Sequence, residues 1–278
     1  MWNERTLKII MIAGLVITAI AIIVMAPWSP KLGPSGSPGR QALLWIFAFV
    51  GALPFAVYWM YRFWQKPSWN AMPGRYVEGM EVEKFSPYTL VAIGVVGALF
   101  AVAALGEGLR LDFQAMVIAA SAALFGGPIS FFGLLLGQIL GRLFIHPFWV
   151  SGGASVFINI LPYSLFDAAI WAYAGFVYFW FVHERKQRGL GLVVAFLIAW
   201  ILSEPVHQFG WFMGDYTIGN PWEAASLNVA RDWIVPQPMF PFLPYWILSI
   251  FAFVPIGYIA GHAVRRAWAG EDAETPVG

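Results

Sequence analysis

The segment from residue 108 to residue 167 constrains the fold more than any other part of the sequence. It holds two apolar runs separated by Gly126-Gly127-Pro128, and a glycine-rich turn and Asp167 follow the second run. Proline breaks a helix, so the first run ends after about 13 residues, too few to cross a bilayer comfortably. A carboxylate inside a later apolar run is costly and indicates a function. We interpret this segment as a layout for holding a ligand inside a membrane.

The composition of the whole chain supports a membrane protein. Charged residues make up 11% of the sequence and hydrophobic residues 60%, whereas soluble domains carry about 25% charged residues. Several apolar runs approach or exceed the roughly 20 residues that cross a bilayer as a helix. Cysteine is absent, which excludes disulfides and thiolate metal sites. The net charge of +1 without a basic tract argues against a nucleic-acid partner.

The apolar runs predict an all-α, polytopic protein with about eight transmembrane helices in the lipid bilayer. The first run is long for a signal peptide, and we interpret it as a retained helix. Pro54 predicts a kink in the second helix. The eight predicted helices are Ile9–Ala26, Gln41–Tyr61, Tyr88–Leu105, Phe113–Phe125, Ile129–Ile145, Val156–Val182, Gly189–Phe212 and Phe242–Val264.

Four basic segments predict the orientation of these helices. They lie at residues 5–8, 62–84, 183–188 and 265–266. Eight crossings place all four on one side of the membrane, which the positive-inside rule makes cytoplasmic. Fusing the fourth and fifth helices into one span would scatter the four segments over both sides. We therefore predict a multi-pass protein of the cell membrane with cytoplasmic N- and C-termini.

A polar stretch between the second and third helices predicts the domain boundary. Residues 1–87 form a two-helix N-terminal appendage with a basic cytoplasmic linker, residues 88–266 form a six-helix core, and residues 267–278 form a polar tail.

Small residues at four-residue spacing predict close helix packing. On the third helix they are Gly94-xxx-Ala98 and Gly97-xxx-Ala101. These two pairs serve equally well for packing inside the protein or for docking a separate subunit. On the fifth helix, three glycines at the same spacing share one face: Gly133, Gly137 and Gly141.

Polar residues at membrane depth are the candidate ligand contacts. Asn159, Tyr163, Asp167 and Trp171 recur every four residues on the sixth helix, so they share one face. They could contact a ligand, or they could form a structural hydrogen-bond network with neighbouring helices. Gln138 and Arg142 mark the outer half of the fifth helix, and Arg142 could extend its charge to the membrane surface.

A second polar cluster follows at the outer end of the seventh helix. Its residues are three or four apart, so their side chains can line one cavity: they are Glu204, His207, Gln208 and Trp211. We expect a ligand contact or a structural network there. A Glu–His pair without further ligands is weak support for a metal, so we predict neither a metal nor a cofactor.

Two charged residues on the outer loop before the fourth helix complete the candidates. Arg110 and Asp112 could pair with each other or clamp a charged ligand. The sequence contains neither a phosphate-binding loop nor a nucleophile elbow, so we do not expect an enzyme.

Residues 108–141 have the sequence GLRLDFQAMVIAASAALFGGPISFFGLLLGQILG. With the six-helix layout of residues 88–266, this stretch resembles the substrate-binding membrane subunit (S component) of energy-coupling-factor transporters, which import vitamins and micronutrients. The family has an outer loop, a short helix, a Phe-Gly-Pro turn and a glycine-seamed helix in this order. Here the turn is Phe125-Gly126-Gly127-Pro128, one glycine longer than the common form.

The resemblance implies capture of a small vitamin-like metabolite from outside the cell. It also implies a coupling protein and ATPases as partners. Family members often dock the coupling subunit through an Ala-xxx-Ala patch on the first core helix. The small-residue pairs at 94–98 and 97–101 correspond to that patch with a glycine in place of the first alanine. The alternative interpretation is a non-catalytic integral membrane subunit of a respiratory or other membrane complex.

Overall fold

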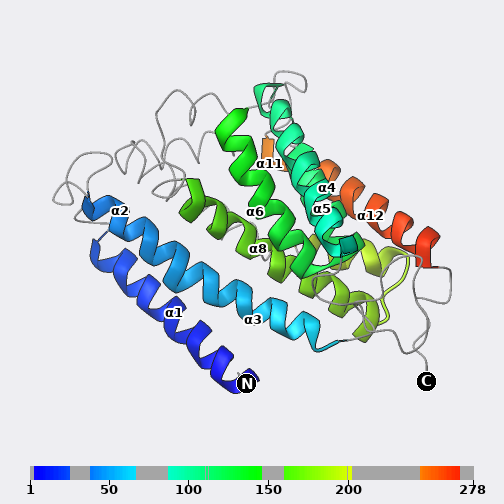
Figure 1. Cartoon of the computed structure of the whole chain (residues 1–278). Coiled ribbons are helices and arrows are strands. Elements are labelled where there is room, and N and C mark those ends of the chain that lie inside the picture. Colours follow the sequence, from blue (N-terminus) through cyan, green and yellow to red (C-terminus); the bar gives the residue numbers. More distant parts are fainter. Residues whose placement is uncertain are drawn as a thin grey trace.

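The computed structural model describes residues 3–25, 38–66, 87–109, 111, 113–145, 160–198, 200–201 and 245–269. All regular structure in these ranges is helical, which confirms the predicted all-α class for this part of the chain. Figure 1 shows the helices lying side by side. Five of them are long and apolar enough to cross a membrane: Glu4–Val24, Gln41–Trp64, Pro87–Gly106, Gly127–Phe144 and Leu161–Glu184. A shorter apolar helix spans Phe113–Phe125.

The helices follow the predicted runs closely. Their bounds are α1 Glu4–Met25, α2 Pro38–Trp45, η2 Ile46–Ala52, α3 Leu53–Trp64, α4 Pro87–Ala103, η4 Ala104–Leu109, α5 Phe113–Phe125, α6 Gly127–Phe144, α8 Leu161–Phe179, η6 Trp180–Glu184, α11 Tyr245–Leu248, η7 Ser249–Phe253 and α12 Val254–Ala269. Helical residues 190–198 belong to the predicted seventh helix. The predicted break at 126–128 separates α5 from α6, because Gly126 has a φ of 80° that glycine adopts without strain.

Two prolines sit immediately after wide π-helical turns. Pro54 is the second residue of α3, directly after η2, and Pro255 is the second residue of α12, directly after η7. Proline lacks an amide hydrogen and clashes with the carbonyl four residues earlier, and a π-turn displaces that carbonyl. The sequence therefore predicted the irregularity at Pro54, and its form is a widened turn. For Pro54 the affected carbonyl is Val50, and Gly14 of α1 packs directly against it.

A glycine seam joins α6 to α4. A Cβ atom at Gly137 would lie 2.7 Å from the carbonyl oxygen of Gly97, and one at Gly133 would lie 2.6 Å from the Val96 side chain. At Gly141 the nearest atoms, from Ala101 and Ala104, are 3.8 Å away. The predicted close backbone contact is confirmed, and its partner is the helix that carries the small residues Gly97 and Ala101.

Glycines also allow close contact between α5 and α12. Gly257 lies against the carbonyl oxygen of Met116, and Gly261 lies against that of Ala120. The residue numbers increase in the same direction along both helices, so α5 and α12 are parallel, as are α4 and α6. Close backbone approach replaces large side chains along both seams, which is the usual way for helices to pack inside a membrane.

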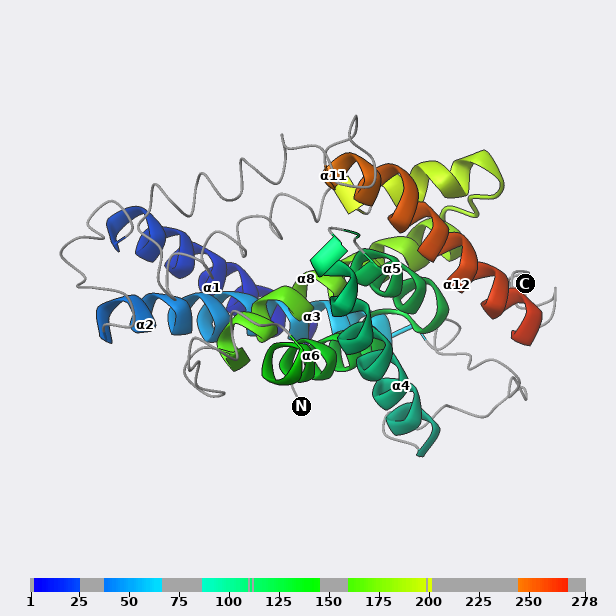
Figure 2. The same cartoon turned by 90° about the horizontal axis from the view of Figure 1, so that it is seen from above.

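The central helix is α8, with nearly every residue from 162 to 179 buried. Both views place it among the other helices (Figures 1 and 2). Buried residues of η2 and α3 share one hydrophobic core with α4, α5, α6, α8 and α12. The N-terminal helices are thus packed onto the helices of residues 88–266. The stretch predicted as the domain boundary lies mainly at 67–86, outside the described residues.

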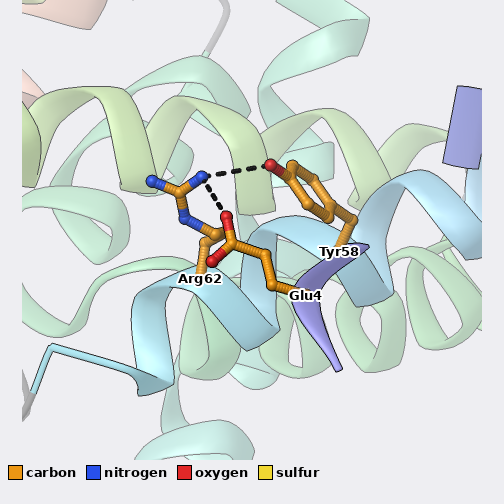
Figure 3. A network of polar contacts seen from close by, with 3 residues as sticks. All are labelled: Glu4, Tyr58 and Arg62. Carbon is orange, nitrogen blue, oxygen red and sulfur yellow. Dashed lines mark hydrogen bonds and ion pairs between the residues drawn. The ribbon is translucent and has the colours of Figure 1, made fainter. Parts of the chain in front are cut away.

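Charged side chains tie several helix ends together at one end of the molecule. Arg62 at the end of α3 pairs with Glu4 at the start of α1, with Nη1 and Oε1 2.7 Å apart, and also donates to the Tyr58 hydroxyl (Figure 3). Lys66 pairs with Glu184 at 2.5 Å. The described parts of the four predicted basic segments therefore gather at one end.

Arg265 ties α12 to α5 at that same end. Its Nη1 donates to the carbonyl oxygen of Leu124 at 2.8 Å, and its guanidinium lies 4.5 Å from the centre of the Phe179 ring. Leu124 lies in the last turn of α5, where carbonyls have no partner within the helix. The arginine therefore caps α5 from a helix distant in sequence.

Candidate functional site

A buried polar cluster lies where α6 meets α8. It consists of Gln138 and Arg142 from α6 and Tyr163 and Asp167 from α8, with exposed fractions between 2% and 6%. On each helix the two residues are four apart, so both pairs project from a single face. The glycine seam occupies a different face of α6, toward α4. Thus α6 is held close to α4 on one side and presents polar groups to α8 on the other.

The carboxylate of Asp167 is the centre of this cluster. Gln138 Nε2 donates a hydrogen bond to Asp167 Oδ2, and Arg142 Nη2 lies 3.6 Å from the same oxygen. Arg142 Nη1 also donates to the carbonyl oxygen of Gln138 at 3.4 Å, and the guanidinium lies 4.1 Å from the centre of the Tyr163 ring. The Asp167 carboxylate therefore accepts a hydrogen bond from a neutral amide and forms an ion pair with a guanidinium, and both groups come from α6.

The energetics explain why these residues occur together. An isolated charge in an apolar interior is unfavourable by several kcal/mol even after the surroundings relax. Asp167 and Arg142 compensate each other, and Tyr163 covers the cation with an aromatic face. We expected Arg142 to extend to the membrane surface. That interpretation was wrong, because the side chain is 7% exposed and finds its counter-charge within the protein.

The cluster lies far from the basic end of the molecule. The first residue of α6, Gly127, packs against Ala172 of α8, and the preceding Gly126 packs against the Phe63 ring near the end of α3. Gln138 is 11 residues further along α6, which corresponds to roughly 16 Å of helix rise. Asp167 correspondingly lies in the first half of α8, away from η6.

Trp171 follows Asp167 on α8 but contacts another helix. Its ring stacks on Trp200 with centroids 4.7 Å apart and an interplanar angle of 25°. Both indoles are buried. Within the described ranges, Trp200 Nε1 and Ser164 Oγ are buried without a hydrogen-bond partner. Two polar groups beside the cluster thus have unused hydrogen-bonding capacity.

The structure brings some of the predicted site residues together and leaves others outside its described ranges. Tyr163 and Asp167 are in the cluster, and Trp171 adjoins it. Seven predicted residues lie outside the described residues: Arg110, Asp112, Asn159, Glu204, His207, Gln208 and Trp211. In the described part of the chain, no group of three or more potential metal ligands occurs.

Sequence reasoning noted Gln138 and Arg142 without assigning them to the site. Their four-residue spacing on a helix with a glycine seam was the available signal, because a seam fixes which face meets one neighbour. Trp200 had no comparable signal. Its role depends on how helical residues 190–198 and 200–201 pack against α8.

The four predicted docking residues on α4 divide between two faces. Gly97 and Ala101 are buried against α6. A Cβ atom at Gly94 would meet nothing within 4 Å, and Ala98 is exposed. Of the two pairs, only Gly94–Ala98 therefore lies on a face of α4 that no other described residue covers.

Comparison with family models, with curated proteins and with solved structures gives no match for this chain.

Proposed function

We propose that this protein is a membrane-embedded substrate-capture subunit for uptake of a small vitamin-like metabolite. The observation that carries the proposal is the buried cluster of Gln138, Arg142 and Asp167 between α6 and α8. Ionisable residues within membrane-spanning helices mark ligand and ion sites more often than they mark simple anchors. A small polar or aromatic metabolite suits this site, because charges, amides and indoles occur side by side.

In this proposal the ligand enters from the end of the bundle that carries the cluster. Arg142 and Asp167 orient its polar groups, and Trp200 Nε1 and Ser164 Oγ supply further hydrogen bonds. The sequence has no phosphate-binding loop, so partner ATPases and a coupling protein supply the energy for transport. The exposed Gly94–Ala98 face of α4 is the place where the coupling protein docks.

The proposed topology has eight membrane spans, with both termini in the cytoplasm of a cell-membrane protein. Its support is the gathering of basic residues from α1, α3, the segment after η6, and α12 at one end of the molecule. The positive-inside rule assigns that end to the cytoplasm. The ligand cluster then lies in the outer half of the membrane, where capture from outside requires it.

Mass spectrometry of small molecules tests the proposal. The full-length protein is extracted gently, purified and denatured, and the released metabolites are compared with those from an unrelated membrane protein treated in the same way. We expect one small metabolite to be enriched in near-stoichiometric amount. Asp167→Ala or Glu204→Ala should reduce the amount of this metabolite. If both variants retain as much as the wild type, the ligand does not bind at the proposed site.

One observation favours a second function. The Asp167 carboxylate has a donor and a cation within the same chain, so the cluster is also satisfied as a purely structural network. The protein would then be a non-catalytic subunit of a respiratory or other membrane complex. Native mass measurement of gently extracted assemblies separates the two functions. Co-isolated ATPases favour substrate capture, and co-isolated redox subunits favour the second function.

A further inference from the structure

The turn between η6 and helical residues 190–198 carries an exposed group of cations. Arg185, Lys186 and Arg188 follow one another closely, and all three are exposed. The carboxylate directly before the turn, that of Glu184 at the end of η6, is paired with Lys66, which follows α3, at 2.5 Å. The turn therefore presents a concentrated positive charge at the end of a helix that is long and apolar enough to cross a membrane.

Hydrogen bonds hold this turn in a defined shape. The amide of Arg185 donates to the Trp180 carbonyl at 3.0 Å, and the amide of Gln187 donates to the Phe181 carbonyl at 3.2 Å. Gln187 Nε2 also donates to the carbonyl oxygen of Arg185 at 3.2 Å. These bonds hold the backbone of the turn from which the three cationic side chains project.

Lys186 occupies a backbone conformation that normally favours glycine. Its φ is 51°, the only positive value for a non-glycine residue within the described ranges. A left-handed conformation costs a residue with a β-carbon free energy that glycine would avoid. Residues in such conformations persist only where the surrounding structure holds them, and they cluster at functional sites. A lysine at this position is therefore informative about what the turn binds.

The surroundings of the turn have the character of a lipid interface. The Arg185 guanidinium lies 4.5 Å from the centre of the Trp180 ring, and tryptophan is enriched at the depth of lipid headgroups. Immediately after the turn, Leu190, Val194 and Ile198 are 79%, 46% and 36% exposed. Their four-residue spacing makes one apolar stripe that leads away from the cations. The cations are suited to contact an anionic lipid headgroup, and the exposed apolar stripe beside them is suited to contact the acyl chain of the same lipid.

We propose that this turn binds the phosphate headgroup of an anionic phospholipid through Arg185, Lys186 and Arg188, with an acyl chain against the stripe of Leu190, Val194 and Ile198. Clusters of basic residues directly beside a membrane helix bind anionic lipids in this way. The site is separate from the Asp167 cluster, and it does not depend on what the protein transports.

Lipid binding by the purified full-length protein tests the proposal. Affinities for phosphatidylglycerol and phosphatidylcholine are measured in the same detergent by native mass spectrometry. The test variant is Arg185→Gln/Lys186→Gln/Arg188→Gln. The matched control is Arg5→Gln/Lys8→Gln, which removes cations from α1 near the same end of the molecule. Thermal unfolding in the same detergent checks that both variants are folded.

We expect the wild-type protein to prefer phosphatidylglycerol at least tenfold. Each basic side chain near an anionic headgroup contributes about fivefold in affinity, so the triple variant should lose about a hundredfold and the control should keep most of its affinity. Equal affinity for the two lipids, or an equal loss in the control, would overturn the proposal. Displacement of phosphatidylglycerol by millimolar inorganic phosphate would also overturn it, because the turn would then be a site for free phosphate.

Discussion

Arg142 on α6 and Asp167 on α8 form an ion pair in the protein interior, with Nη2 and Oδ2 3.6 Å apart and side chains 7% and 3% exposed. The pair links two helices that are both long and apolar enough to cross a membrane. It also places opposite charges next to an aromatic ring and an amide. The stability of the α6–α8 contact and the capacity to bind a polar ligand therefore depend on the same two residues.

Removing one member of this pair should destabilise the protein strongly. Asp167→Leu leaves Arg142 as an uncompensated buried charge, which lowers the free energy of unfolding by about 3–5 kcal/mol. Arg142→Met/Asp167→Leu removes both charges and should recover most of that loss. Thermal unfolding in detergent measures both variants. Equal destabilisation by the single and double variants would mean that the two charges are not coupled.

The glycine seam makes a prediction with an internal control. Gly137→Ala would place a Cβ atom 2.7 Å from the carbonyl oxygen of Gly97, and such overpacking costs about 1–3 kcal/mol. At Gly141 the nearest atoms are 3.8 Å away, so Gly141→Ala should be tolerated and could add up to about 1 kcal/mol through helix propensity. Thermal unfolding of the two variants in parallel checks the seam. Similar melting temperatures would show that α4 and α6 are further apart than described.

Capping of α5 by Arg265 predicts a difference between this arginine and an exposed one, Arg5. Arg265→Gln loses the hydrogen bond to the Leu124 carbonyl and the contact with the Phe179 ring. A hydrogen bond to a charged group contributes about 1.5–3 kcal/mol, so the melting temperature should fall. Arg5 on α1 is exposed, and Arg5→Gln should change stability by less than about 0.5 kcal/mol. The cap would be refuted by equal effects at the two positions.

The left-handed backbone of Lys186 predicts a stabilising substitution. Lys186→Gly relieves the conformational cost, which is about 1–2 kcal/mol for a residue with a β-carbon, and should raise the melting temperature. Lys186→Ala removes the same charge but keeps the β-carbon, so it should give no such rise. Parallel unfolding of the two variants separates backbone strain from charge. If alanine stabilises as much as glycine, charge repulsion rather than strain is relieved.

The sequence predicted those parts of the fold that depend on local patterns. Apolar runs located the helices, and Gly126 with Pro128 located the break between α5 and α6. The spacing of Gly133, Gly137 and Gly141 predicted a close contact, although it could not name α4 as the partner. Partner choice depends on which faces remain after all helices pack, and a single helix does not carry that information.

The candidate site was only partly predictable for the same reason. The shared face of Tyr163, Asp167 and Trp171 followed from helix periodicity. The partners of Asp167 lie 25 and 29 residues earlier in the chain, so only the packing of α6 on α8 identifies them. Arg142 in isolation has the sequence character of a residue near the membrane surface. Its burial follows from the position of Asp167 on the facing helix.

The most direct test of substrate capture is the amount of small molecule that each variant retains. Released metabolites are quantified per mole of purified protein for the wild type, for Arg142→Met/Asp167→Leu and for Gly141→Ala, with melting temperatures to confirm folding. We predict a near-stoichiometric metabolite in the wild type and in Gly141→Ala, and its loss in the folded double variant. No enriched metabolite in the wild type, or equal retention in all three proteins, would contradict a ligand site at Arg142 and Asp167.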